Sequence, residues 1–262
     1  GTNIINLIAI EPDERIETVL SIRDNTKDGF LFMATKQGIV KKTPLSDFKN
    51  LRKNGLIAIN LREGDELLKV KVTRGDANII IVTQNGYAVR FSEKNVRAMG
   101  RTASGVRSIN LKDDDIAVCM DIAVDSEDLL IISEYGFGKR TPISEYKVQN
   151  RGGVGLITYK ISEKTGKVVG ATMCNELDEL MLINSSGVAI RINVKDISVT
   201  GRSAMGVTLM RTNEDEKVVA VAKISGSEEE NVEEQIDILD DYNGKDDILD
   251  ELVNRAQSDS EE

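Results

Sequence analysis

The sequence contains no histidine and no tryptophan, and only 4% of its 262 residues are aromatic. The lack of histidine removes the commonest general base and the commonest metal ligand. There is also no Cys-x-x-Cys pair, no phosphate-binding loop ending in Gly-Lys-Ser/Thr and no Gly-x-Ser-x-Gly elbow. An acidic cluster, Asp113 to Asp115, falls where a turn is expected, which favours solvated turn residues over a metal site. We therefore predict that the chain alone is not catalytic and holds no metal or cofactor.

Cysteines are scarce, and long apolar runs are absent. Cys119 and Cys174 stand 55 residues apart in apolar, strand-like surroundings, which favours reduced thiols in the core of a cytoplasmic protein. No apolar run approaches the roughly 20 residues that a membrane-spanning helix requires. No charged segment followed by an apolar stretch opens the chain, so nothing indicates secretion. These absences predict a cytoplasmic location and no membrane partner.

Charge is distributed unevenly along the chain. The net charge of −10 argues at first against a nucleic-acid partner. However, residues 225–262 hold 15 acidic side chains and only two basic ones, Lys245 and Arg255. The other 224 residues hold 32 basic and 29 acidic side chains, a net charge of +3. The chain therefore consists of a mildly basic body, residues 1–224, and an acidic tail, residues 225–262, which we expect to be disordered.

Glycines recur with a period of about 50 residues. One set lies in tight turns and the other set opens apolar strands. The turn glycines are Gly38, Gly86, Gly136 and Gly187, and the second glycines are Gly55, Gly105, Gly155 and Gly206. Successive turn glycines are 48, 50 and 51 residues apart, and successive second glycines are 50, 50 and 51 residues apart. Independent domains would not keep such phase, so the body is a repeat protein.

Each repeat carries four short strand patterns. In the second repeat, Asn78 to Val82, the Asn85-Gly86 turn and Tyr87 to Phe91 are typical of a β-hairpin. Apolar segments at Val106 to Leu111 and Ile116 to Ile122 complete the set. The repeats run approximately over residues 17–68, 69–118, 119–169 and 170–219. With only three prolines and no long 3.6-residue period in the body, the sequence predicts an all-β, propeller-like array of four-stranded blades.

The first residues fall inside a repeat. Gly1 to Leu7 is similar to Gly55 to Leu61 and Gly105 to Leu111, which open the third strand of later repeats. We therefore expect residues 1–16 to be the end of a preceding blade, and the chain to be a fragment of a longer protein.

Basic residues keep the same phase as the glycines. A Lys or Arg after a hairpin turn is often only a solvated strand end, but recurrence at one phase would place such residues along one edge of the array. A basic edge with few aromatic residues suits the phosphates of duplex DNA better than unstacked bases. No recognition helix is apparent, so base-specific readout is not expected. The candidate DNA-binding residues are Lys41, Lys42, Arg52, Lys53, Arg90, Arg97, Arg101, Arg107, Lys139, Arg140, Arg151, Arg191 and Arg202.

Four groups of motifs are the most specific. They are Phe32-Met33-Ala34-Thr35 with Gly38 and Val40-Lys41-Lys42-Thr43; Val96-Arg97-Ala98-Met99-Gly100 with Gly105-Val106-Arg107; Tyr135-Gly136-Phe137-Gly138-Lys139-Arg140-Thr141; and Ile197-Ser198-Val199-Thr200-Gly201-Arg202. Together they resemble the C-terminal domain of the A subunit of bacterial DNA gyrase, one of the type IIA DNA topoisomerases. The resemblance covers roughly residues 1–224, and the acidic tail also suits the family.

The resemblance implies a six-bladed β-pinwheel, in which neighbouring blades exchange strands and a basic rim wraps DNA. In the whole enzyme, of A2B2 composition, such wrapping supports ATP-dependent negative supercoiling, and ATP and magnesium belong to the B subunit. The family's catalytic tyrosine lies in an N-terminal domain outside this chain. The resemblance places the family's Gln-Arg-Arg-Gly-Gly-Lys-Gly box upstream. The nearest internal match is Gln149 to Gly155, which carries over a rim role for Arg151 only.

Two other functions remain open at this point. One is the equivalent domain of topoisomerase IV, which would deliver DNA for decatenation, and the other is a propeller-like protein-interaction scaffold. The tail likewise has two interpretations: a polyanion that competes with DNA for the basic rim, or a segment that only increases solubility.

Overall fold

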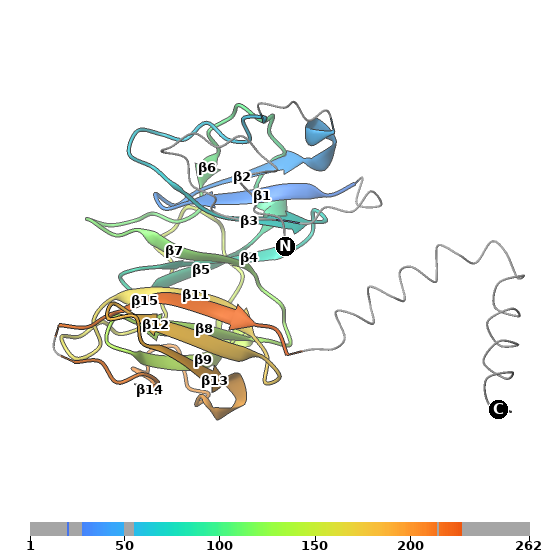
Figure 1. Ribbon diagram of the computed structural model, residues 1–262. Helices are drawn as coiled ribbons and strands as arrows, with labels where there is room; N and C mark the ends of the chain where they lie inside the picture. Colours follow the sequence, from blue (N-terminus) through green and yellow to red (C-terminus); the bar gives the residue numbers. More distant parts are fainter. Residues whose placement is uncertain (1–19, 21–27, 50–54, 214, 227–262) are drawn as a thin grey trace, which may run out of the picture. The chain divides into compact units, whose positions relative to one another are not determined.

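The computed structural model describes residues 20, 28–49, 55–213 and 215–226, and the chain divides into two compact units, residues 1–224 and 225–262. Regular structure in the described part of the first unit consists of β-strands and short 3-10 helices, with no α-helix (Figure 1). The expected all-β fold is therefore confirmed. The expectations for residues 1–16, for Arg52 and Lys53, and for nearly all of the acidic tail lie outside the described residues.

Four antiparallel sheets follow one another along the chain (Figure 1). The first has the order β3-β1-β2-β6, with strands Leu67–Thr73, Phe30–Thr35, Ile39–Pro44 and Val106–Arg107. The second has the order β10-β5-β4-β7, with strands Leu156–Ile157, Tyr87–Ser92, Asn78–Thr83 and Ala117–Ile122. The third has the order β11-β8-β9-β14, with strands Val168–Cys174, Asp128–Ser133, Phe137–Pro142 and Val207–Thr208. The fourth has three strands, β13-β12-β15, at Ala189–Asn193, Glu179–Asn184 and Val218–Ile224.

Each of the first three sheets receives one edge strand from the following repeat. β6 of the second repeat pairs with β2, β10 of the third pairs with β5, and β14 of the fourth pairs with β9. The register is the same each time: for example, Val207 lies opposite Gly138 and Thr208 opposite Phe137. These exchanged strands are two residues long, shorter than the apolar segments that predict them. The strand exchange implied by the family resemblance is present.

This exchange explains members of both sets of repeating glycines. At Gly136, φ is +75° and an added Cβ would lie 2.0 Å from the carbonyl oxygen of Met210, which follows the exchanged strand β14. At Gly206, φ is +83° and an added Cβ would lie 2.2 Å from the carbonyl oxygen of Gly138. Glycine is therefore needed where the backbones of neighbouring blades touch, as well as for the turn conformation.

The hydrophobic core lies between neighbouring sheets. Along β4, Ile79 and Ile81 pack with Phe32 and Val40 of the first sheet. The alternate residue Ile80 packs instead against the third sheet. Successive side chains of a strand point to opposite faces, so a strand covered on both faces must be apolar throughout. This is why the central strands appear in the sequence as unbroken apolar runs rather than as alternating patterns.

A 3-10 helix follows the second strand of each hairpin, where the sequence indicates only a polar connection. These helices are η2 (Leu45–Phe48), η3 (Glu93–Asn95), η4 (Ile143–Glu145) and η5 (Val194–Asp196). In η3, the fully buried Glu93 carboxylate accepts hydrogen bonds from Thr73 Oγ1 at 2.8 Å and from the backbone nitrogens of Gly75 and Ala77 at 3.0 and 2.8 Å. Glu93 therefore anchors the loop that joins the first and second sheets.

Candidate nucleic-acid interface

The basic residues that follow the turn glycines lie on the second strand of each hairpin. Lys41 and Lys42 are on β2, Arg90 is on β5, and Lys139 and Arg140 are on β9. The structure buries all five, with exposed fractions between 0 and 7%. The expectation that these residues line an open edge of the array is therefore wrong.

Their burial follows from the strand exchange, because a loop of the next repeat folds over β2, β5 and β9. Backbone bridges fix this loop at the same place each time: Lys42 pairs with Ala98, Arg90 with Val148 and Arg140 with Val199. The strand ends, which would be solvated in an isolated hairpin, are therefore covered by the neighbouring blade.

The buried side chains that stand four residues after a turn glycine hold the 3-10 helix of the next repeat. They are Lys42, Arg90 and Arg140. Lys42 Nζ donates to Glu93 O at 3.0 Å, and Arg90 donates to Ile143 O and Tyr146 O at 3.2 and 3.3 Å. Arg140 Nε donates to Ile197 O at 2.8 Å. Of these carbonyls, Tyr146 O and Ile197 O lie at the helix ends, where the helix itself provides no donor. These side chains therefore join each blade to the next.

Carboxylates complete the environment of these charges. Lys42 Nζ lies 3.7 Å from Glu93, and Arg140 lies 3.3 Å from both Asp128 and Glu176. Arg90 is paired with Asp125. The positive charge of Lys42, Arg90 and Arg140 is therefore paired with carboxylates of the chain itself, of which Asp125 and Glu176 are exposed.

Lys41 and Lys139 stand three residues after a turn glycine, and each holds the backbone of the next loop. Lys139 Nζ donates to Gly201 O at 2.8 Å and to Arg202 O at 2.5 Å, and it lies 5.7 Å from the centre of the Tyr159 ring. Burial lowers the pKa of Lys139 to about 8, although the nearby Glu145 carboxylate acts in the opposite direction. Burial likewise lowers the pKa of Lys41, and Asp47 partly offsets this.

Arg191 is the exception at the fourth hairpin. It lies on β13 of the last sheet, where no exchanged strand is present among the described residues. Its side chain is 58% exposed and is paired with Glu179. The comparison with Arg140 shows that burial at this phase depends on the neighbouring repeat.

The basic residues around the second glycines lie at or near the surface. Arg97 and Arg107 are exposed, and Arg101, Arg151 and Arg202 are half-buried. The structure brings these residues to the outer parts of the loops that cover β2, β5 and β9. They are therefore the members of the sequence-predicted set that remain available to a ligand.

The surface arginines differ in how firmly they are held. Within the described part of the chain, the guanidinium groups of Arg97 and Arg101 have no hydrogen-bond or ion-pair partner. Arg151 donates to Asn95 O and to Arg107 O, each at 3.0 Å. Arg202 Nη1 donates to Ile157 O at the long distance of 3.5 Å. Arg97 and Arg101 are therefore the freest to bind an anion.

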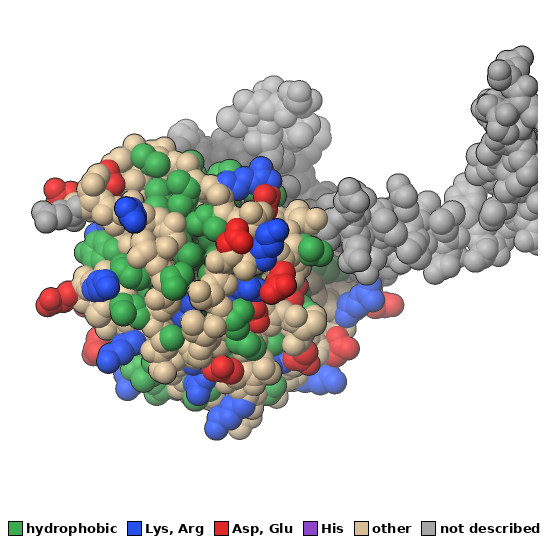
Figure 2. All heavy atoms as spheres, turned by 90° about the horizontal axis from the view of Figure 1, so that it is seen from below, with side chains coloured by type: hydrophobic (Ala, Val, Ile, Leu, Met, Phe, Trp, Pro, Cys, Tyr) green, Lys and Arg blue, Asp and Glu red, His purple; other side chains and the backbone are tan. Residues whose placement is uncertain are grey.

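Sequence reasoning missed Lys147, an exposed residue in the loop of the third repeat. Tyr146-Lys147-Val148 occupies the repeat position of Val96-Arg97-Ala98, so the alignment of repeats would have identified it. On the face seen in Figure 2, Lys and Arg side chains are interspersed with Asp and Glu rather than gathered into one continuous patch.

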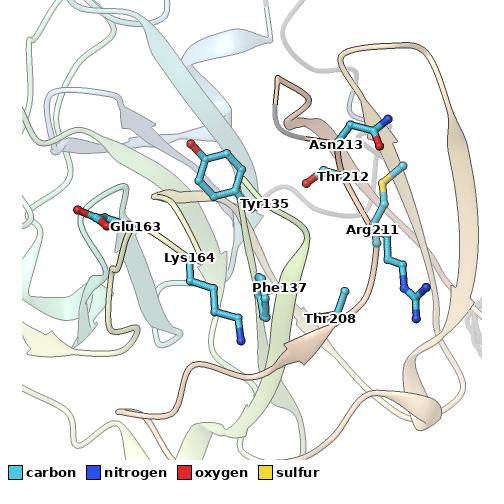
Figure 3. Close-up of a pocket in the computed structure, with 9 residues that line it drawn as sticks. Tyr135, Phe137, Glu163, Lys164, Thr208, Arg211, Thr212 and Asn213 are labelled. Carbon is cyan, nitrogen blue, oxygen red and sulfur yellow. The ribbon is translucent and has the colours of Figure 1, made fainter.

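An open cavity of about 540 Å³ lies between the third and fourth repeats. Figure 3 shows the Lys164 side chain beside Phe137, with Tyr135 and Arg211 also on the lining. Lys164 Nζ lies 5.3 Å from the centre of the Phe137 ring. No candidate DNA-binding residue lines this cavity.

Other types of site receive no support from the residues that the structure describes. Among them, no group of three His, Cys, Asp or Glu residues is placed to hold a metal ion, and no helix is long and apolar enough to cross a membrane. Cys119 and Cys174 are buried and free, as predicted. Burial raises the pKa of each thiol to about 12, so neither has the character of a reactive cysteine.

The four repeats match a known family. The family described as DNA gyrase C-terminal domain, beta-propeller, matches residues 29–74, 77–118, 127–175 and 178–225. The chain belongs to the DNA gyrase C-terminal domain family. Each matched segment contains one hairpin, and all except 77–118, which ends two residues into β7, also contain the whole outer strand beside it. The family repeat therefore follows the sequence period, while the sheets run across it.

Two relatives of this chain are similar to it in sequence. The DNA gyrase A subunit of Clostridium acetobutylicum is 53% identical over 238 residues, which cover 91% of this chain and 29% of the relative. That of Staphylococcus epidermidis is 45% identical over 228 residues, which cover 86% of this chain and 26% of the relative. The chain therefore spans less than a third of the length of these relatives.

Two solved structures are similar. The C-terminal domain of DNA topoisomerase IV gives a TM-score of 0.81 at 28% identity and covers 86% of this chain and 71% of the other. A DNA gyrase A C-terminal domain gives a TM-score of 0.75 at 30% identity and covers 85% of this chain and 75% of the other. Both support the pinwheel fold predicted for the body.

Proposed function

We propose that the body of this chain binds duplex DNA without sequence preference and bends it around its blades. One observation carries the proposal: the same surface loop recurs at three successive blade boundaries, and each loop bears Arg or Lys. The residues are Arg97 and Arg101 in the first loop, Lys147 and Arg151 in the second, and Arg202 in the third.

The recurrence of the loops suits a long, repetitive anion. Duplex DNA carries one negative charge per about 1.7 Å of its axis, so regularly placed cations neutralise successive phosphates. The loops offer no exposed aromatic platform of the kind that single-stranded bases need. DNA wrapping by backbone contacts alone requires no base readout, in agreement with the absence of α-helices from the described residues.

In the whole enzyme, this module would belong to the A subunit of gyrase and support ATP-dependent negative supercoiling. The chain itself would be non-catalytic, since ATP and magnesium are expected in the B subunit of an A2B2 complex. The similarity to the topoisomerase IV domain keeps decatenation as a second candidate. The 53% identity to the DNA gyrase A subunit of Clostridium acetobutylicum favours gyrase, whereas the two solved domains, at 30% and 28% identity, do not discriminate.

A salt series on a duplex of about 100 base pairs tests the proposal. The variant Arg97→Ala/Arg101→Ala is expected to reduce the slope of log K against log salt by about 1.8, because each lost phosphate contact removes about 0.9. Arg62→Ala/Lys112→Ala is the matched control, because it removes two charges from turns outside these loops. Affinity that is indifferent to salt, or equal effects of the two variants, would contradict phosphate binding by the loops and favour a protein-interaction scaffold.

A further inference from the structure

We propose that the buried Lys41 and Lys139 are positioning residues, which hold the loop of the following repeat so that its arginine faces DNA. The inference rests on the proposed function, and it assigns a role to two residues that have no access to DNA themselves. Each ammonium group lies beneath the loop, and the guanidinium group that it positions lies above.

The same arrangement occurs at two separate blade boundaries. Lys41 Nζ donates to Ala58 O at 2.5 Å and also to the backbone oxygen of Arg101. Lys139 Nζ donates to Gly201 O at 2.8 Å and to the backbone oxygen of Arg202 at 2.5 Å. In both cases, the ammonium group binds the carbonyl of the arginine whose side chain reaches the surface. Recurrence at a spacing of two repeats makes a chance contact a poor explanation.

The fold of a blade does not itself require a charge at this position. The corresponding residue is Val89 on β5 and Ile190 on β13. Within the described part of the chain, neither Lys41 nor Lys139 has a carboxylate within ion-pair distance. A buried ammonium group without an ion pair is costly, so packing alone would favour an apolar residue. The contacts that offset this cost are those to the loop, together with Ala58 O for Lys41 and the Tyr159 ring for Lys139.

The second blade boundary shows what happens where the lysine is missing. There the loop is held by a backbone bond from Gly152 to Ser108 O at 2.6 Å, and the Arg151 guanidinium donates to Asn95 O and Arg107 O. The arginine is thus partly used to fix its own loop. At the first boundary, Lys41 holds the loop, and the Arg101 guanidinium is left without a partner among the described residues. At the first boundary, the lysine beneath the loop therefore leaves the arginine above it free, whereas at the third boundary the Arg202 guanidinium still contacts Ile157 O at 3.5 Å and Glu145 at 4.0 Å.

A double-mutant cycle in the salt dependence of duplex binding tests this role. Lys41→Met keeps the length and apolar character of the stem but removes the donor group. Lys41→Met and Arg101→Ala are each expected to reduce the slope of log K against log salt by about 0.9, and the double variant by no more than either. Lys112→Met is the control for the loss of one charge and should leave the slope unchanged.

The outcomes separate this inference from the proposed function. If Arg101→Ala reduces the slope but Lys41→Met does not, or if the two reductions add, Lys41 has only a structural role and the inference fails. If the unmodified protein shows no salt-dependent binding, the proposed function fails first. Thermal unfolding checks that each variant is folded. Should Lys41→Met not fold, the same cycle with Lys139→Met and Arg202→Ala decides, and failure of both lysine variants to fold would overturn the inference in favour of a purely structural role.

Discussion

Gly136→Ala offers a sharp test of the exchanged-strand architecture. Gly136 lies in the hairpin turn of the third repeat, and its carbonyl oxygen accepts hydrogen bonds from Leu209 N at 2.8 Å and Met210 N at 3.1 Å. An alanine Cβ there would lie 2.0 Å from the carbonyl oxygen of Met210, a separation that cannot be accommodated without moving the backbone. The substitution therefore forces the segment that contains β14 away from the third sheet.

Two effects add up in this variant. An alanine at φ of +75° costs about 1–2 kcal/mol, since a Cβ crowds the backbone in the left-handed region. Displacement of the exchanged segment adds the loss of two hydrogen bonds, each worth about 1 kcal/mol net. We expect Gly136→Ala to lower the free energy of unfolding by about 3–4 kcal/mol.

Gly187→Ala provides the matched control. Gly187 occupies the same turn position in the fourth repeat, with φ of +82°, but no atom lies within 4 Å of its added Cβ. The control therefore carries the backbone cost of about 1–2 kcal/mol alone. In thermal unfolding followed by circular dichroism, Gly136→Ala should melt about 4–8 °C below Gly187→Ala, at about 2–4 °C per kcal/mol for a domain of this size. Equal melting temperatures would refute the contact between Gly136 and the exchanged segment.

Three further predictions concern buried ionisable groups. Removal of the buried Glu93 carboxylate by Glu93→Ala should cost about 3–5 kcal/mol in urea unfolding, because Lys42 is left buried without its partner; a loss below about 1 kcal/mol would contradict this. The pKa of Lys139 is about 8 in the folded protein against the ordinary 10.5, so between these pH values the unfolded chain binds more protons and the free energy of unfolding rises with pH, by up to about 1.4 kcal/mol per pH unit. Lys139→Met should abolish that rise, and a rise that persists in the variant would show another origin. Cys119 and Cys174, with pKa values near 12, should resist a thiol reagent at pH 8 in the native protein and react after denaturation; rapid native labelling would contradict their burial.

The basic residues show where sequence reasoning reached its limit. The period of the repeats identifies positions that recur, and this recurrence predicts a shared surface. For Lys42, Arg90 and Arg140, it instead reflects a shared contact with the next repeat. A charge-reversal test at such positions would disrupt the joints between blades rather than a binding surface. Substitutions at Arg97 and Arg101 test DNA binding without touching those joints.

The sequence alone determined the fold class, the four repeats, their hairpins and the division between a basic body and an acidic tail. These features depend on short-range patterns: glycines in turns, apolar runs in strands and local charge. Only the tertiary structure decided which sheet each third strand joins, and hence which cations are buried. That decision depends on contacts between residues about 60 positions apart, such as Lys41 with Arg101 and Lys139 with Arg202, because a residue's burial is set by the neighbouring repeat that covers it.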